Sequence, residues 1–272
     1  MVNKIIVGSA NFNQKYGVKK NFIKKNEIKK LFNLAAKNKI KVIDTSPLYK
    51  ESEKIIGQIN NNRFKVISKI PKPPKNIKKE NIKKWLKHDV MISLKNLKIK
   101  KFECLLLHNV NSLLSKNGDE IYKSIKNIKA NKLTNKIGIS IYDFNTLDKI
   151  LKKFRFDLIQ APLNIFDQRL VDSGWLKKLK SKKIEVHARS IFLQGILLSE
   201  VESIPCKFVK FREGMKKIKS LCKKNGMTKL EVALGFLNSI NLVDYKVIGF
   251  NSLTQLKQII FLNKKTKVKK KI

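Results

Sequence analysis

Short apolar runs alternate with amphipathic stretches along almost the whole chain, and this alternation constrains the fold more than any other feature. Eight of the runs have the length and β-branched content of buried strands. They lie at residues 4–8, 41–44, 64–69, 102–108, 136–140, 157–160, 184–189 and 245–250. Helical stretches follow them near residues 26–38, 51–60, 78–97, 119–131, 144–153, 169–181, 208–240 and 253–262. Strict alternation predicts a parallel sheet, because parallel neighbours need a crossover connection.

The number of strand–helix units favours one closed barrel. Eight units in 272 residues match a (β/α)8 TIM barrel, which typically has ~250 residues. The alternative, an open doubly wound sheet, usually carries a glycine-rich phosphate loop after its first strand. Here the first strand runs into GSANFNQKYG, which is not GxGxxG, and the chain contains no GxxxxGK[ST] motif. The segment 223–228 divides the longest helical stretch, with Gly226 suited to end one helix and Thr228 to begin another.

No linker rich in proline, glycine or serine divides the chain. We therefore expect a single barrel domain over residues 1–272, with a basic, frayed tail at 263–272. No run of 18 apolar residues indicates a transmembrane helix, and the N-terminus resembles a strand rather than a signal peptide. The three cysteines lack metal-like or disulfide-like spacing, which predicts free thiols in a reducing cytoplasm and no metal site.

The net charge of the chain is extreme, at +41 from 61 basic and 20 acidic residues. One interpretation is a nucleic-acid or other anionic partner. The other is a compositional bias, because isoleucine, asparagine and lysine are all abundant. Only five of the basic residues are arginine, the residue favoured for bidentate phosphate and base recognition. Since the lysines are also scattered along every helix, we favour compositional bias over a nucleic-acid partner.

Four ionisable residues fall at the carboxyl ends of three successive predicted strands or in the loop that follows. Asp44 ends the second strand and Tyr49 follows it, Lys69 ends the third strand, and His108 ends the fourth. In TIM barrels the carboxyl-terminal end of the strands carries the catalytic and ligand-binding residues. A phenol has a pKa near ~10, and an adjacent ammonium is expected to lower it. The set predicts a tuned phenolic acid that can protonate an oxygen while a carbonyl is reduced.

The segment DTSPLYKESEKIIG at 44–57 resembles the D-T-A-x-x-Y-G-x-S-E-x-x-L-G segment of the aldo-keto reductases. The resemblance runs from VGSANFNQKYG near the start to VIGFNSLTQLKQ near the end. It implies that Tyr49 is the general acid, that Asp44 and Lys69 tune it, and that His108 orients the carbonyl. It also implies a nicotinamide cofactor, NADP(H) or NAD(H), bound across the rim of the barrel.

The resemblance further implies the residues that hold the cofactor. Ser140 and Gln160 match those that bind the carboxamide, and the loop 188–197 matches the one that wraps the pyrophosphate. The last loop and helix match the site of the adenosine phosphate, at a helix N-terminus. The cofactor-binding residues that we predict are Ser140, Gln160, Arg189, Ser190, Phe192, Gly195, Gly249, Asn251 and Gln255.

Four positions depart from the family pattern. Ile141 replaces an asparagine after Ser140, and Arg189 stands where many members stack a tyrosine on the nicotinamide, although a guanidinium can also stack. Asn251 stands where many members carry an arginine for the 2′-phosphate, so preference for NADPH or NADH stays open, with Ser252 and Lys257 as possible substitutes. Lys50 replaces a frequent glycine. The chain is also short for the family, which predicts short substrate loops.

Three functions follow as hypotheses. The first is NAD(P)H-dependent reduction of an aldehyde or ketone, with a small carbonyl compound as the partner. The second is a cofactor-binding regulatory barrel, favoured by the changes at Ile141 and Arg189, and the third is nucleic-acid binding. Phe12 and Leu48 can either line a substrate pocket or belong to the core, and we expect His187 to pack. The substrate and the oligomeric state stay open.

Overall fold

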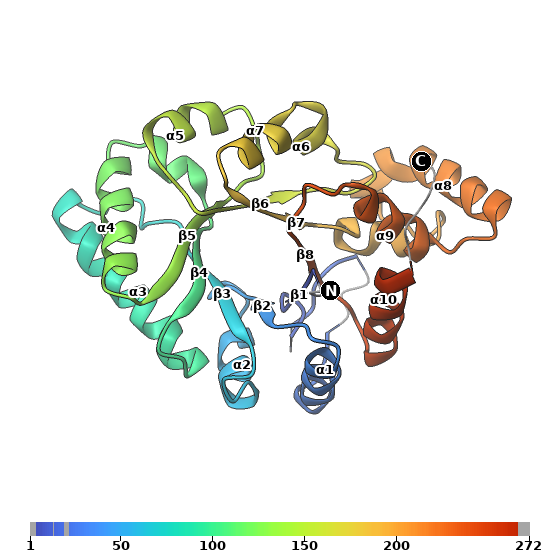
Figure 1. The fold of residues 1–272 in the computed structure, drawn as a ribbon, viewed down its shortest axis with the longest axis horizontal. Helices are drawn as coiled ribbons and strands as arrows, with labels where there is room; N and C mark the ends of the chain where they lie inside the picture. Colours follow the sequence, from blue (N-terminus) through green and yellow to red (C-terminus); the bar gives the residue numbers. More distant parts are fainter. Residues whose placement is uncertain (1–3, 13, 19–21, 266–272) are drawn as a thin grey trace.

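A computed structural model of the chain describes residues 4–12, 14–18 and 22–265. Eight parallel strands close into a barrel in sequence order, and each neighbour in that order is hydrogen-bonded to the next (Figure 1). The predicted TIM barrel is therefore confirmed. The strands are β1 (Ile5–Gly8), β2 (Val42–Asp44), β3 (Lys65–Ile70), β4 (Phe102–Leu107), β5 (Thr134–Ser140), β6 (Leu158–Pro162), β7 (Glu185–Arg189) and β8 (Tyr245–Ile248).

Helices surround the barrel on its outside (Figure 1). They are α1 (Lys25–Lys37), α2 (Ser52–Ile59), α3 (Ile82–Leu97), α4 (Gly118–Ala130), α5 (Leu147–Lys153), α6 (Arg169–Asp172), α7 (Trp175–Ser181), α8 (Arg212–Asn225), α9 (Lys229–Ser239) and α10 (Leu253–Lys265). Short 3₁₀ segments lie at Lys79–Asn81, Val110–Leu114, Leu193–Leu198 and Cys206–Phe211.

The predicted helix at 169–181 is in fact two helices. Gly174 separates α6 from α7 with a φ of 74°, in the left-handed region that glycine adopts without strain. The break predicted at 223–228 is confirmed, because Gly226 ends α8 with a φ of 60°. Thr228 then begins α9 with a capping box, in which its hydroxyl and the Glu231 carboxylate satisfy each other's backbone N–H groups.

Side chains fill the barrel, so that its interior is a packed core. Ile67, Cys104, Leu106 and Leu158 meet there and are almost completely buried. Cys104 is a free thiol, and burial raises its pKa well above the usual range. A larger apolar layer lies between the outward face of the strands and the helices. The barrel therefore provides a rigid support for the loops at both of its ends.

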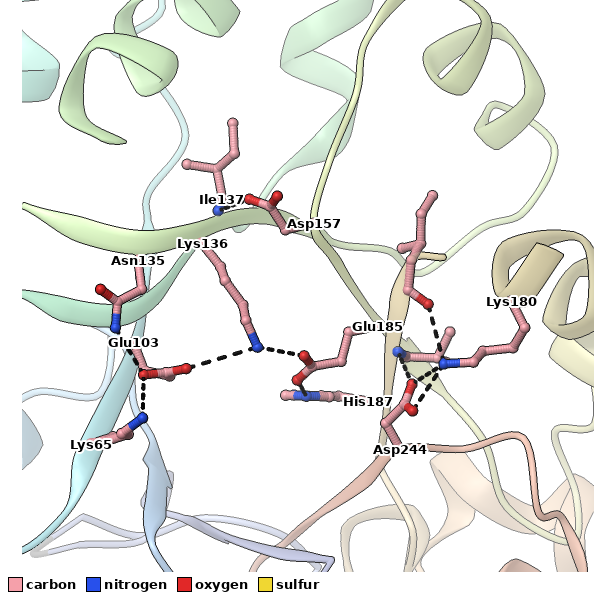
Figure 2. Close-up of polar contacts among 12 residues, drawn as sticks. Lys65, Glu103, Asn135, Lys136, Ile137, Asp157, Lys180, Glu185, His187 and Asp244 are labelled. Carbon is pink, nitrogen blue, oxygen red and sulfur yellow. Dashed lines mark hydrogen bonds and ion pairs between the residues drawn. The ribbon is translucent and has the colours of Figure 1, made fainter. Parts of the chain in front are cut away.

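A chain of ion pairs spans the amino-terminal end of the barrel (Figure 2). Glu103 lies 3.1 Å from Lys65 and 3.8 Å from Lys136, and Lys136 lies 2.5 Å from Glu185. Glu185 in turn contacts Nε2 of His187 at 2.6 Å. Burial acts to raise the pKa of Glu185, but hydrogen bonds from His187 and Lys136 outweigh it and lower that pKa to about 2. His187 therefore belongs to this network, in agreement with a packing role.

Other features of the described ranges complete the fold. Among these residues, no helix combines the length and apolar character needed to cross a membrane. The same residues contain no group of three or more His, Cys, Asp or Glu side chains placed to hold a metal ion. Helix α10 includes residues 263–265 of the predicted tail, and residues 266–272 lie outside the described residues.

Candidate active site

A cavity of about 270 Å³ opens at the carboxyl-terminal end of the barrel. The loops after β1, β2, β5, β7 and β8 surround it. Its lining includes Asp44, Tyr49, Gln160, Arg189, Ser190, Phe192, Gly195, Gly249, Asn251 and Gln255 from the sequence prediction. Ligand sites of TIM barrels lie at this end, where residues distant in sequence converge. The cavity is thus the candidate active site.

Asp44 and Lys69 form a buried ion pair at the base of this cavity. Lys69 Nζ donates to Asp44 Oδ1 at 2.6 Å and to the carbonyl of Thr45 at 2.8 Å. The side chains of Asp44 and Lys69 are only 4% and 2% exposed. Gln160 Nε2 donates to the other carboxylate oxygen of Asp44 at 2.7 Å. Both charges are therefore compensated, as buried charges must be.

Tyr49 lies in the turn between β2 and α2, with Lys69 Nζ 5.4 Å from its ring centroid. Burial, and after it the negative charge of Asp44, raise the pKa of the Tyr49 phenol. The sequence led us to expect the opposite direction, from the lysine. The reason for the difference is that burial has the largest effect on this pKa and that the charge of Lys69 is already paired with Asp44. In this state the phenol keeps its proton over the physiological range.

Lys50 adopts the backbone conformation that a glycine would supply at its position. Its φ is 43°, in the left-handed region. A residue with a Cβ atom is strained there, at a cost of ~1–3 kcal/mol. The turn that presents Tyr49 therefore has a left-handed residue directly after the tyrosine, where glycine would fit without strain.

His108 follows β4, where its backbone N–H donates to the carbonyl of Ile70 at 3.0 Å. Burial, and after it the positive charge of Lys69, lower the pKa of His108 to about 4. The imidazole is therefore neutral at pH 7. Its Nδ1 is buried and has no hydrogen-bond partner in the structure. A neutral imidazole at this position can donate a hydrogen bond to a carbonyl oxygen.

Ser140 and Gln160 present unpaired polar atoms on adjacent strands. The two residues are register partners on β5 and β6. Ser140 Oγ and Gln160 Oε1 are both buried without a hydrogen-bond partner. Leaving such a group unsatisfied costs ~1–3 kcal/mol, so these atoms need a ligand group to pair with. A carboxamide, which has both a donor and an acceptor, fits this pair.

Arg189 ends β7 and lies against Tyr142. Its guanidinium carbon is 3.9 Å from the centroid of the Tyr142 ring. Its Nη2 donates to the carbonyl of Ile141 at 2.6 Å, and its Nη1 to Ser190 Oγ at 2.9 Å. Ile141 is fully buried, so the residue that replaces the family asparagine contributes only its main chain here. The two departures from the family pattern are therefore in direct contact.

The loop after β7 has an unusual backbone. Ser190, Leu193, Gln194 and Gly195 all have φ between 46° and 98°. Its Gln194 carbonyl accepts from the N–H of Val18 at 3.0 Å, and a Cβ on Gly17 would come within 2.7 Å of that oxygen. The loop after β1 can approach this closely because Gly17 has no side chain. The two loops together form one wall of the cavity.

The loop after β8 is held by Asn11. Asn11 Nδ2 donates to the carbonyl of Phe250 at 2.5 Å and to Asn251 Oδ1 at 3.2 Å. Asn251 donates its N–H to Gln255 Oε1 at 2.6 Å, which fixes the start of α10. Gly249 and these residues line the cavity as predicted.

The structure brings most predicted site residues to one cavity, and three of them flank it. Lys69, His108 and Ser140 lie beneath or beside its lining residues. Leu48 is 59% exposed, whereas Phe12 is fully buried in the core. Several lining residues were missing from the predicted site, among them Asn11, Tyr16 and Tyr142. Their position in loops that follow strand ends is the signal that could have identified them.

The fold and the cavity define a TIM-barrel protein with a polar ligand site at the carboxyl ends of its strands. A family model described as the aldo/keto reductase family matches residues 4–272, and the chain belongs to this family. The family supports an oxidoreductase activity. No curated protein sequence matches the chain.

Two solved structures illustrate the shared fold. An aldo-keto reductase from Bacillus halodurans in its holo form is 17% identical, with a TM-score of 0.76, and the match covers 97% of this chain and 88% of that one. A glycerol dehydrogenase from Gluconobacter oxydans is 18% identical, with a TM-score of 0.70 and coverage of 96% and 86%. At this identity the likeness concerns the fold.

Proposed function

We propose that the protein reduces a small aldehyde or ketone with NADPH or NADH, and that Tyr49 is the general acid. The observation that carries the proposal is the buried Asp44–Lys69 pair, 2.6 Å apart, beneath a protonated phenol at the base of the cavity. Membership of the aldo/keto reductase family supports the same reaction class.

Each residue of the site has a distinct role in the proposed reaction. Tyr49 gives its proton to the carbonyl oxygen as negative charge develops there, which contributes ~10²–10⁴-fold. Neutral His108 orients that oxygen by donating a hydrogen bond. The negative charge of Asp44 makes it harder for Tyr49 to lose its proton. Lys69 binds Asp44 and thereby reduces this effect. When bound, the cofactor would supply a hydride to the carbonyl carbon, and with the proton from Tyr49 one C–H and one O–H bond would replace the C=O π bond.

The cofactor-binding residues fit the group that they are proposed to hold. Ser140 Oγ and Gln160 Oε1 are unpaired and would bind the carboxamide. Ser190, Phe192 and Gly195 lie in the cavity loop proposed for the pyrophosphate, and Arg189 stands at the family's nicotinamide-stacking position. Gly249, Asn251 and Gln255 would receive the adenosine phosphate near the start of α10, where the helix dipole favours an anion.

We further infer that the protein works in a reducing cytoplasm, since Cys104, Cys206 and Cys222 are free thiols. Lysines scattered over the surface do not favour a nucleic-acid partner.

Fluorescence titration with NADPH and NADH tests the proposal. We expect saturable quenching with a Kd in the micromolar range, on the order of −8 kcal/mol. Asn251 offers no charge to a 2′-phosphate, and a charge-assisted contact contributes ~1.5–3 kcal/mol, so preference for NADPH should stay below about a hundredfold. Failure of both cofactors to bind below millimolar concentration would refute the proposal. Binding without hydride transfer to any carbonyl would instead support the regulatory barrel.

A further inference from the structure

The guanidinium of Arg189 has hydrogen-bonding capacity that the protein does not use. Two of its five N–H groups are bound, one by the carbonyl of Ile141 and one by Ser190 Oγ. Its Nε is buried and has no partner in the structure. One face of the group is covered by the ring of Tyr142. Unused N–H groups therefore remain on a side chain that lines the cavity.

Arg189 also carries charge that no other described residue neutralises. Among the described residues no carboxylate forms an ion pair with it, in contrast to Arg169, which binds Asp167 at 2.8 Å. Asp44 and Lys69 neutralise each other, and His108 is uncharged at pH 7. The base of the cavity thus has a net positive charge. A partly buried cation in this situation favours an anionic partner.

The position of Arg189 points to the substrate end of the cavity. Arg189 lines the same cavity as Asp44, Tyr49 and Tyr16. Its positive charge also acts to lower the pKa of Tyr49 and of His108, although burial dominates both pKa values. The guanidinium therefore acts on the two groups proposed to hold the carbonyl oxygen. An anion bound there would lie beside the reacting carbonyl.

We propose that Arg189 selects carbonyl substrates that carry a carboxylate, which it binds through its free N–H groups while Tyr49 and His108 hold the carbonyl oxygen. This inference rests on the proposed reductase function. The guanidinium is suited to this role because its planar N–H groups match a carboxylate bidentately.

Matched pairs of an oxo acid and its methyl ester test the proposal. Suitable pairs are glyoxylate, succinic semialdehyde and para-formylbenzoate, each with its ester, because they place the charge at different distances from the carbonyl. For at least one pair we expect kcat/KM of the wild-type protein to favour the acid about tenfold to a hundredfold. In Arg189→Gln this ratio should fall to about one, and Arg189→Lys should restore part of it.

The control is Arg63→Gln, which removes the same charge outside the cavity, where Arg63 binds Asn33 at 2.7 Å. This variant should keep the wild-type ratio. Equal kcat/KM for acid and ester in every pair would overturn the proposal, and so would an unchanged ratio in Arg189→Gln. Because each ratio is taken within one variant, a loss of cofactor affinity common to both substrates cancels.

A binding measurement separates this proposal from the proposed function and from another source of anion, the cofactor pyrophosphate. Calorimetric titration of the NADPH-saturated protein with benzoate should give Arg189-dependent binding, whereas benzamide should bind at least about tenfold more weakly. If no carbonyl is reduced, the reductase proposal fails, and this titration still decides the role of Arg189. Benzoate that binds only without NADPH would assign the guanidinium to the pyrophosphate and overturn the proposal.

Discussion

The two ends of the barrel use polar residues in opposite ways. At the amino-terminal end, Glu103, Lys136 and Glu185 form a continuous chain of ion pairs (Figure 2). At the carboxyl-terminal end, five of the ten buried side-chain atoms that lack a partner among the described residues lie around the cavity. They belong to Asn11, His108, Ser140, Gln160 and Arg189.

This difference separates stability from function within one fold. The ion pairs of the amino-terminal network contribute to folding, although Nδ1 of His187 there is also unpaired, whereas each unsatisfied buried atom costs ~1–3 kcal/mol. Such a cost persists where a ligand can later offset it. The Asp44–Lys69 pair is an exception at the carboxyl-terminal end, because it is both fully paired and placed for chemistry.

The largest effect on activity short of removing the phenol should come from Lys69→Met. It leaves the buried Asp44 carboxylate without its cation, and this carboxylate already raises the pKa of Tyr49. Single-turnover hydride transfer should slow by at least about a hundredfold, and the free energy of unfolding should fall by ~3–5 kcal/mol. Lys65→Met, four residues earlier on β3 and 63% exposed, is the control and should keep the wild-type rate. A normal rate in Lys69→Met would remove this pair from the mechanism.

Glu185→Gln should lower the stability of the protein and leave its activity unchanged. It removes the carboxylate that binds both Lys136 and His187. The side chains of Glu185 and Lys136 are 22% and 34% exposed. We expect urea unfolding to report a loss of ~1–3 kcal/mol, with hydride transfer unchanged. Glu213→Gln, which breaks the exposed pair with Lys216, should leave the free energy of unfolding almost unchanged. Loss of activity in Glu185→Gln would show that the two ends are coupled.

The pH dependence of stability should report His108. Its pKa is about 4 in the folded protein, below its usual 6.5, so the unfolded chain binds the extra proton between these values. The free energy of unfolding should therefore fall as pH drops from 6.5 to 4, by ~1–2 kcal/mol after allowance for partial exposure. His108→Gln should lose this part of the slope. Removal of the exposed His88 should leave the slope unchanged, and an unchanged slope in His108→Gln would contradict the assignment.

The smallest expected effect is a gain of stability from Lys50→Gly. The φ of 43° at Lys50 strains any residue with a Cβ atom, and glycine relieves this. We expect a gain of ~0.5–1 kcal/mol in urea unfolding. Lys54→Gly, in the first turn of α2, should instead lose stability, by up to about 1 kcal/mol. A loss of stability in Lys50→Gly would mean that the lysine side chain stabilises the turn.

The sequence was sufficient to predict the fold, because most strands are continuous buried runs and most helices bury one apolar face. All eight strands and the break between α8 and α9 follow from these patterns. The sequence could not predict that the helical stretch 169–181 breaks at Gly174 into two helices. A single glycine in a helical pattern is compatible with either outcome until its φ is known.

The sequence was less informative about how the site residues interact. The rule that strand ends converge predicted that Asp44, Tyr49, Lys69 and His108 would lie at one end. It could not show that Lys69 turns to Asp44 and leaves the pKa of Tyr49 raised, since that depends on side-chain directions and burial. Nor could it show the stacking of Arg189 on Tyr142, because Arg189 ends β7, Tyr142 lies in the loop after β5, and their contact requires the closed barrel.

The central claim, that Tyr49 is a proton donor and not a packing residue, is tested most directly by single-turnover hydride transfer in Tyr49→Phe. The change keeps the ring and removes the hydroxyl, so we expect the rate to fall by at least a factor of about 10² while cofactor affinity changes little. Addition of Lys69→Met should not multiply this loss, because both changes disable one proton-donating unit. Tyr142→Phe is the matched control, with its phenol at the rim of the same cavity. A near-wild-type rate in Tyr49→Phe, on a carbonyl that the wild-type protein reduces well, would contradict the account.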